Sequence, residues 1–108
     1  MTRSLPLVFS ALGDPTRFAI VERLLADGEV SAGEIAATLP ISAPAVSRHL
    51  RVLQEAGAVT RRVDKQRRLY SAEPATLRAI SQWVQDHRAF WERSLDRLEA
   101  ALAKHEDD

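Results

Sequence analysis

The side chains best suited to chemistry in this sequence are basic, and they gather in one region of the chain. Residues 42–70 contain seven lysines and arginines and two acidic residues, a net charge of +5, whereas the rest contains eight basic and thirteen acidic residues, a net charge of −5. The total charge of zero conceals this division. A basic region beside an acidic remainder is typical of proteins that bind a polyanion such as nucleic acid.

The first half of the basic region, residues 42–57, has the pattern of an amphipathic helix. Ser42 is suited to cap its start, and Gly57 to end it in a left-handed conformation. Its buried face is marked by Val46, Leu50 and Leu53. Its outer face combines small, hydrogen-bonding and charged residues: Pro44, Ser47, Arg48 and Arg51, with Ser42, Ala45 and His49 flanking them. Such a face can enter the major groove of DNA, about 12 Å wide, although an ordinary helix with solvated arginines would show the same spacing.

The alternating residues after Gly57 predict a β-hairpin over residues 58–71. We expect strands at 59–63 and 67–71 joined by a turn at 64–66, although the Asn-Gly or Asp-Gly pair typical of such turns is absent. Five basic residues fall within eight positions: Arg61, Arg62, Lys65, Arg67 and Arg68. This density favours contact with DNA phosphates or the minor groove over a hairpin whose charges are merely solvated.

Shorter helices are expected to hold this region in place. The first spans residues 4–12, and the second begins at Asp14 with a proline in its first turn. The second helix should bury Phe18, Ile20, Val21, Leu24 and Leu25. The third spans residues 32–38 and opens with a capping box formed by Ser31 and Glu34. With the helix at 42–57 it makes a helix-turn-helix over about residues 31–57, and the hairpin that follows is its wing.

Residues 74–104 contain no glycine, and no proline after the first residue, and they predict one long helix. Its length would be roughly 45 Å, more than a domain of this size can cover. Apolar residues recur along it at steps of three and four, a near-heptad seam that predicts pairing with a second copy. With the first helix, the expected dimer interface comprises Leu5, Val8, Phe9, Leu77, Ile80, Val84, His87, Trp91, Leu95 and Leu98. The alternative is a long helix that folds back onto its own domain.

Length and composition limit the remaining possibilities. A chain of 108 residues, 45% hydrophobic and 28% charged, is expected to form one domain, residues 1–108, mainly α-helical with a small β-hairpin. No apolar run is long enough to span a membrane, and the N-terminus lacks a signal peptide, so we expect a cytoplasmic protein. The absence of cysteine excludes disulfides, thiolate metal sites and a cysteine nucleophile. No nucleophile with a base, phosphate loop or paired carboxylates indicate an enzyme.

Two motifs resemble the ArsR/SmtB family of winged-helix repressors. They are Gly13-Asp14-Pro15-Thr16-Arg17, followed by Ile20 and Leu24, and Ser42-x-x-x-Val46-Ser47-x-His49-Leu50-x-x-Leu53-x-x-Ala56-Gly57. The resemblance implies a homodimer built on the first and last helices. It also implies that this dimer binds a palindromic operator, with these residues in or beside the groove: Ser42, Ala43, Ala45, Ser47, Arg48, His49 and Arg51. It also implies wing contacts near Lys65, Gln66 and Arg67. The family's usual wing-tip glycine is Gln66 here, and Ala58 replaces a larger apolar residue, so the wing geometry departs from the pattern.

The metal sites of this family are not matched by the sequence. Members that respond to metals through cysteine carry a Cys-x-Cys pair at the positions of Ser31 and Gly33. Others use an Asp-x-His and a later histidine, whereas Asp86 and His87 are adjacent here and His105 follows eighteen residues after His87. The chain therefore resembles the branch without a recognised metal site, and no metal or cofactor is predicted.

The sequence thus predicts a sequence-specific DNA-binding transcriptional regulator, a homodimeric repressor of an inverted-repeat operator. Two alternatives stay open: a winged helix that binds an acidic protein partner, and a repressor that senses metal through histidine and carboxylate ligands. The sequence names no effector, although a cleft lined by Trp83, Phe90 and Trp91 is conceivable for a small apolar ligand.

Overall fold

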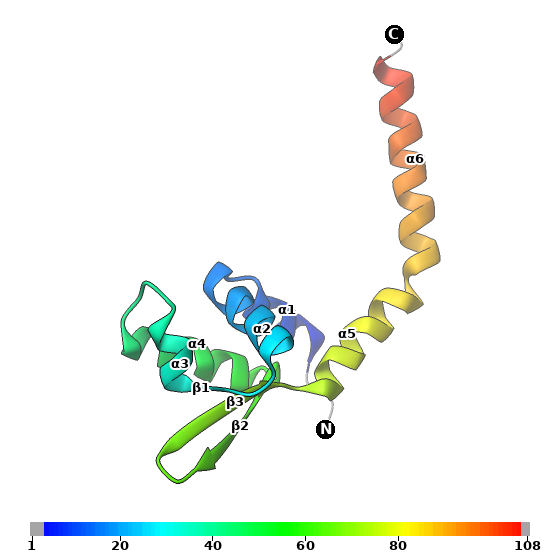
Figure 1. The fold of residues 1–108 in the computed structure, drawn as a ribbon. Coiled ribbons are helices and arrows are strands. Elements are labelled where there is room, and N and C mark those ends of the chain that lie inside the picture. The colour runs from blue at the N-terminus through cyan, green and yellow to red at the C-terminus, as the bar shows by residue number, and fades with distance from the viewer. Residues whose placement is uncertain (1–3, 107–108) are drawn as a thin grey trace.

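The computed structural model describes residues 4–106; the first three residues of the N-terminal segment considered above lie outside this range. The elements are α1 Leu5–Leu12, α2 Pro15–Asp27, β1 Val30–Ser31, α3 Ala32–Ala37, α4 Ala43–Glu55, β2 Val59–Asp64, β3 Arg67–Ala72, α5 Pro74–Asp86 and α6 Arg88–Glu106. Helices α1–α4 and the antiparallel sheet form a head, residues 4–72, and α5 and α6 form an arm, residues 74–106, that leaves it (Figure 1). The mainly helical winged fold predicted from the sequence is confirmed.

The helices of the head begin and end where the sequence predicts, because local side chains satisfy their terminal backbone groups. The carboxylate of Asp14 accepts from the Arg17 backbone N–H at 3.0 Å, and the hydroxyl of Ser42 accepts from the Ala45 N–H at 3.2 Å. Ser31 accepts from the backbone N–H of Glu34 at 3.2 Å and donates to its carboxylate at 2.9 Å. After α4, Gly57 has a φ of 84°, and paired N–H groups bond back to the last turn as in a Schellman motif.

The core of the head lies between α2, α4 and the sheet. The predicted buried face of α4, Val46, Leu50 and Leu53, is confirmed, because these side chains are at most 2% exposed. The prediction for α2 is wrong at two positions, since Phe18 is 51% and Leu25 is 56% exposed. Ile20, Val21 and Leu24 already fill the narrow arc of α2 that faces the core, and Phe18 and Leu25 lie beside that arc.

The sheet contains one strand that the sequence did not predict. Strand β1 pairs antiparallel with β3, and the sheet order is β1-β3-β2. Two residues are too short to show an alternating pattern, so this strand is defined only by its partner. The hairpin is confirmed, but its turn is shorter than expected: Asp64 pairs with Arg67, which leaves two residues in the turn, and Lys65 has a positive φ of 59°.

The prediction of a single helix over residues 74–104 is wrong, because the arm is broken at His87. In a continuous helix the Trp83 carbonyl would accept from the backbone N–H of His87. That carbonyl instead accepts from Nδ1 of the His87 ring at 2.8 Å, and the His87 backbone N–H turns to Val84. A side chain that takes a place in the helical hydrogen-bond ladder bends a helix. No glycine or proline marks the break, so helix-breaker residues could not predict it.

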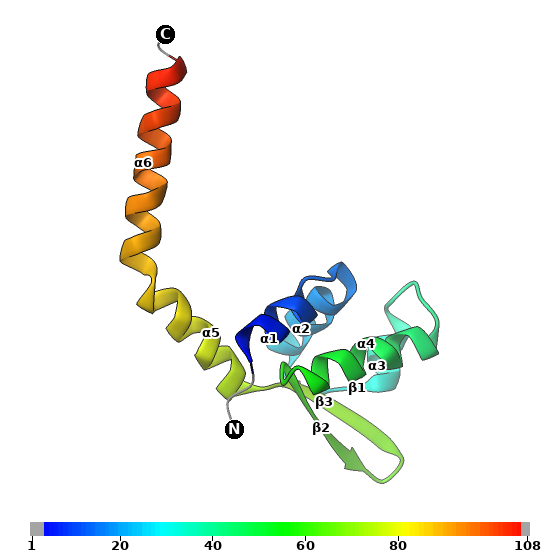
Figure 2. The same ribbon diagram turned by 180° about the vertical axis from the view of Figure 1, so that it is seen from behind.

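The arm projects from the head and is covered by little of it (Figures 1 and 2). The radius of gyration is 18.3 Å, whereas a compact domain of this length has a radius of gyration of about 13 Å. The alternative in which the last helix folds back onto the head is therefore not observed. No helix among residues 4–106 has both the length and the apolar composition to cross a membrane.

Candidate nucleic-acid interface

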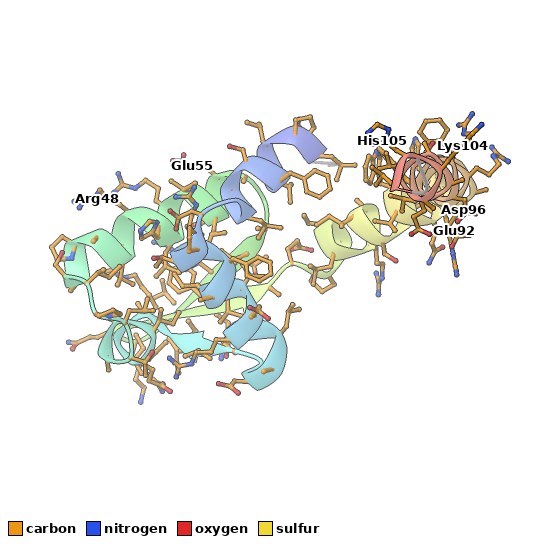
Figure 3. All side chains as sticks on the ribbon, turned by 90° about the horizontal axis from the view of Figure 1, so that it is seen from above. Arg48, Glu55, Glu92, Asp96, Lys104 and His105 are labelled. Atoms are coloured by element: carbon orange, nitrogen blue, oxygen red, sulfur yellow. The ribbon has the colours of Figure 1, made fainter. Side chains whose placement is uncertain are left out.

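The outer face of α4 is open to a partner. On this face, the residues predicted to contact DNA differ in burial. The exposed ones are Ser42, Ala43, Ser47, Arg48 and Arg51, and the half-buried ones are Ala45 and His49. Within residues 4–106, the arginines of this face form no ion pair. Arg48 extends outward from α4, at the other end of the molecule from α6, which Figure 3 views along its axis. The face is therefore free to offer two guanidinium groups to a major groove.

His49 differs from its neighbours on α4 because it lies against the start of α2. Its Nδ1 is 3.3 Å from a terminal guanidinium nitrogen of Arg17 and 3.9 Å from the carboxylate of Asp14. A guanidinium only donates, so Nδ1 of His49 is the acceptor in this contact. Arg17 Nε also donates to the Ala11 carbonyl at 2.6 Å. Arg17 therefore links the end of α1 to the middle of α4.

Asp14 is the acidic member of this cluster, and its environment favours the carboxylate. The hydrogen bond from the Arg17 backbone N–H is the main cause of a lowered pKa for Asp14. Desolvation opposes this shift, and the nearby charge of Arg17 reinforces it. The same carboxylate thus caps α2 and lies beside the contact between Arg17 and His49.

The exposed basic residues of the wing fall into two environments. Arg62 makes a two-pronged ion pair with Glu29, with both N–O distances 2.7 Å, and Arg67 lies 3.4 Å from the carboxylate of Glu34. The hydrogen bonds from Arg62 are the main cause of the lowered pKa of Glu29 and of the raised pKa of Arg62. Within residues 4–106, no ion pair engages the remaining basic residues of the hairpin, Arg61, Lys65 and Arg68. Gln66 is exposed at the tip.

A chain of aromatic rings joins α1 to the arm. Phe9 meets Trp83 edge-on with ring centroids 5.6 Å apart, and Trp83 lies 5.0 Å from His87 and 6.5 Å from Trp91. Phe90 contacts Trp91 at 5.4 Å. These aromatic residues are exposed, so the cluster is an open apolar surface and not a core.

The residues predicted for the dimer interface lie partly on this apolar surface and partly within the head. Exposed positions are Phe9, Val84, His87, Trp91, Leu95 and Leu98, and half-buried ones are Leu5, Leu77 and Ile80. The prediction for Val8 is wrong, because its side chain is 0% exposed within one chain. Helical spacing placed Val8 on the apolar face of α1, but that face packs against the head while Phe9 turns to the arm.

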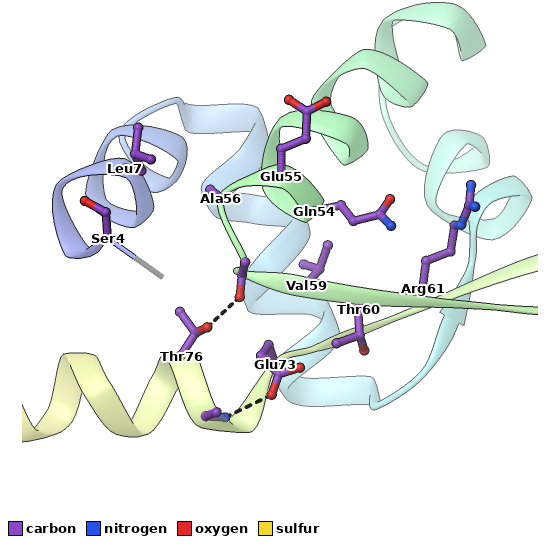
Figure 4. A pocket seen from close by; sticks show the side chains of 12 residues that line it. Ser4, Leu7, Gln54, Glu55, Ala56, Val59, Thr60, Arg61, Glu73 and Thr76 are labelled. Atoms are coloured by element: carbon purple, nitrogen blue, oxygen red, sulfur yellow. Dashed lines mark hydrogen bonds between the residues drawn. The ribbon is translucent and has the colours of Figure 1, made fainter. Parts of the chain in front are cut away.

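A groove of about 880 Å³ lies where the arm meets the head (Figure 4). Its walls come from α1, the end of α4, the start of β2 and the start of α5, and its lining residues do not include the three aromatic residues proposed above for a ligand cleft. Beside it, the hydroxyl of Thr76 donates to the Gly57 carbonyl at 2.6 Å, and the backbone N–H of Glu73 donates to the Ala58 carbonyl at 3.0 Å. These bonds attach the arm to the junction of α4 and β2.

The histidines are far from sharing a site. His49 lies between α2 and α4, and His87 lies at the break in the arm. Among residues 4–106 no three histidine, aspartate or glutamate side chains come close enough together to hold a metal ion.

Sequence reasoning missed the residues that hold the interface in place. Glu29 and Glu34 each lie 33 residues from the arginine they bind, and no local pattern indicates such a distant pair. The sequence identifies Arg17 only as the last residue of the motif Gly13–Arg17. The signal that could have suggested its bridging role is an arginine at the end of this cap motif together with a basic helix at residues 42–57. Arg68 belongs to the basic cluster of the hairpin, although the DNA contacts predicted individually for the wing are Arg61, Arg62, Lys65, Gln66 and Arg67.

Comparison with known sequences gives consistent relatives. Residues 12–62 match a family described as a helix-turn-helix domain. The chain is 42% identical over 106 residues to the HTH-type transcriptional regulator Rv2034 of Mycobacterium tuberculosis, a match that covers 98% of this chain and 95% of that protein. It is 36% identical over 77 residues to the transcriptional repressor SdpR of Bacillus subtilis, covering 71% of this chain and 84% of the repressor.

Solved structures agree with these relatives. The crystal structure of an ArsR family transcriptional regulator superposes with a TM-score of 0.74 at 27% identity, covering 82% of this chain and 96% of that one. A homodimeric winged helix-turn-helix DNA-binding domain from Mycobacterium bovis superposes with a TM-score of 0.62 at 29% identity, covering 77% and 79%. The similarity therefore extends over both the head and part of the arm.

Proposed function

Because the chain belongs to the ArsR family of winged helix-turn-helix transcriptional regulators, we propose that it is a homodimeric repressor of a palindromic operator. Members of this family are DNA-binding regulators and not enzymes. The relatives supply two supports for the finer statement, since one is named a repressor and one solved neighbour is homodimeric. Because the operator is genomic DNA, the proposed place of action is the cytoplasm.

The observation that carries the proposal is the open outer face of α4. Arg48 and Arg51 are exposed on it and form no ion pair within the described residues, and the N-terminal turn of the helix carries only small side chains. In the proposed complex, two copies of α4 occupy successive major grooves about one helical turn apart. Basic residues of the wing bind phosphates, while Ser47, Arg48 and Arg51 of α4 reach base edges.

The proposed dimer is held by α1 and the arm. An apolar surface that one protomer does not cover is formed by the exposed side chains of Phe9, Trp91 and Leu95. In an isologous dimer, this surface of each protomer would be buried against the same surface of the other. Repression then needs no chemistry, because an occupied operator excludes RNA polymerase.

Selection of bound duplexes from a random DNA pool tests the proposal most directly. We expect a consensus with two-fold symmetry whose half-sites are about one helical turn apart. A consensus without symmetry, or no enrichment at low salt, would contradict it.

Two variants test the division between base and phosphate contacts on the selected duplex. Arg48→Ala should weaken binding by about 1–3 kcal/mol and only for the selected sequence, if Arg48 is bidentate to guanine. Lys65→Ala should weaken binding to all sequences alike and flatten the salt dependence. Gel-shift titrations in which the two variants behave identically would reject this assignment.

A further inference from the structure

The wing presents its arginines on two faces of the sheet. The register pairs Arg61 with Tyr70 and Val63 with Arg68, so Arg61 and Arg68 share one face, and Arg62 and Arg67 share the other. Tyr70 on the first face is buried in the core of the head together with α2 and α4. Arg61 and Arg68 therefore lie on the helix side of the sheet, and Figure 4 shows Arg61 rising from β2 on the side of α4. We call Arg61 and Arg68 the helix-side arginines and Arg62 and Arg67 the tethered arginines.

The tethered arginines already have carboxylate partners. The pair between Arg62 and Glu29 is bidentate with distances of 2.7 Å, the geometry in which a guanidinium holds a carboxylate best. The second pair, Arg67 with Glu34, is longer at 3.4 Å and lies nearer the tip. Glu29 precedes β1 and Glu34 lies in α3, so the two pairs join one face of the hairpin to the stretch of chain from the end of α2 into α3. Both pairs connect the wing to the rest of the head.

The helix-side arginines have the opposite situation. Within residues 4–106 neither arginine forms an ion pair with a carboxylate. The two lie diagonally across the hairpin from each other, with their Cα atoms about 7–8 Å apart. Two exposed guanidinium groups at this spacing repel each other weakly in water, and a polyanion lying against both would remove that repulsion. A DNA backbone following α4 supplies that polyanion on the same side of the sheet.

We propose that Arg61 and Arg68 bind DNA phosphates beside Lys65 at the tip of the wing, whereas Arg62 and Arg67 are positioning residues that hold the wing through Glu29 and Glu34. The proposal rests on the DNA-binding dimer described above. It adds Arg68 to the interface and moves Arg62 and Arg67 from contact with DNA to support of the hairpin.

The neighbouring arginines are matched controls for one another. Affinity for sheared calf-thymus DNA is measured at several salt concentrations, because phosphate contacts carry no sequence information. Each of R61Q and R68Q removes one contact per protomer, so the slope of log K against log salt should become shallower by about 1.8 per dimer. R61K and R68K keep the charge and should keep the slope. R62Q, R67Q and E29Q should leave the slope unchanged, with folding of every variant checked by thermal unfolding.

Glu29→Gln separates the proposal from its nearest rival. If Arg62 bound phosphate and Glu29 merely competed for it, E29Q would release Arg62, tighten DNA binding and steepen the slope, which would overturn the proposal. Equal flattening by R62Q and R61Q, or no flattening by R61Q and R68Q, would overturn it as well, even while Arg48→Ala confirms DNA binding by α4. A wild-type chain that binds no duplex would instead overturn the proposed function itself.

Discussion

His49 illustrates how one residue on a DNA-binding helix can serve the protein more than the DNA. Its ring nitrogen accepts from Arg17, whose Nε holds the end of α1, so the side chain connects α4 to two other helices. We infer that His49 sets the position of α4 and does not itself bind phosphate.

This role predicts coupling between His49 and Arg17. His49→Ala should weaken DNA binding without changing the salt slope, and Arg17→Gln should add little in the double variant, with a coupling of about 1 kcal/mol. His49→Gln keeps an acceptor and should behave more like the wild type. Additive losses of affinity, measured by titration of labelled operator, would contradict the positioning role.

Asp14 makes the stability of the head depend on acid. Its pKa is lowered in the folded state, chiefly by the Arg17 backbone N–H, so its contribution is complete above the unfolded pKa and is lost as pH falls through the folded pKa. Asn at this position caps a helix without titrating. We therefore expect the urea stability of the wild type to fall relative to Asp14→Asn as pH drops below about 4. A constant difference between the two proteins across this range would be inconsistent with the role of the carboxylate.

At the scale of elements, the residues just after α4 both end that helix and attach the arm to the head. Gly57 ends α4 with a φ of 84°, and its carbonyl accepts from Thr76 at the start of the arm. The left-handed residue that stops α4 therefore also supplies a carbonyl that attaches the first turn of α5.

Replacement of this glycine should be costly. Gly57→Ala forces a side chain into the left-handed region and should lower the free energy of unfolding by about 1–3 kcal/mol. Gly33→Ala is the matched control, because Gly33 lies inside α3 with open space around an added Cβ, and it should be neutral or stabilising by up to about 1 kcal/mol. Chemical denaturation of the two variants compares them directly, and equal stabilities would contradict this account.

At the scale of the whole molecule, the arm is an apolar surface without a cover. Leu95, Leu98 and Leu102 are each more than half exposed, and α6 contacts little of the head (Figures 1 and 2). In the proposed dimer these side chains meet those of a second copy.

A charge on this surface should separate the protomers. Leu98→Glu alters an exposed position of the single chain but would bury an unpaired carboxylate in the dimer, which costs about 3 kcal/mol or roughly a hundredfold in the dimer dissociation constant. Arg93→Glu, also exposed on α6 but outside the apolar row, is the control and should leave the dimer intact. Sedimentation equilibrium measures both, and an unchanged mass for Leu98→Glu would place the dimer contact elsewhere.

Local chemistry is what the sequence determined on its own. Caps at Asp14, Ser31 and Ser42, the left-handed stop at Gly57 and the apolar stripe of α4 depend on residues within one or two turns of each other, so their types and spacing are sufficient. The alternation of residues 59–63 likewise predicts the hairpin, and the basic cluster indicates a negatively charged partner.

Tertiary structure decided the features that depend on partners distant in the chain or on competition for a single hydrogen bond. Strand β1 exists because β3 lies beside it, and the tethering of Arg62 depends on a glutamate 33 residues away. The break in the arm arises because the ring of His87 displaces its own backbone N–H from the Trp83 carbonyl, a choice that helical periodicity does not encode. Val8, expected in the dimer interface, is buried within the chain, and Phe18, expected in the core, is exposed. Both differences arise because the width of the buried arc on a helix is set by what packs against it.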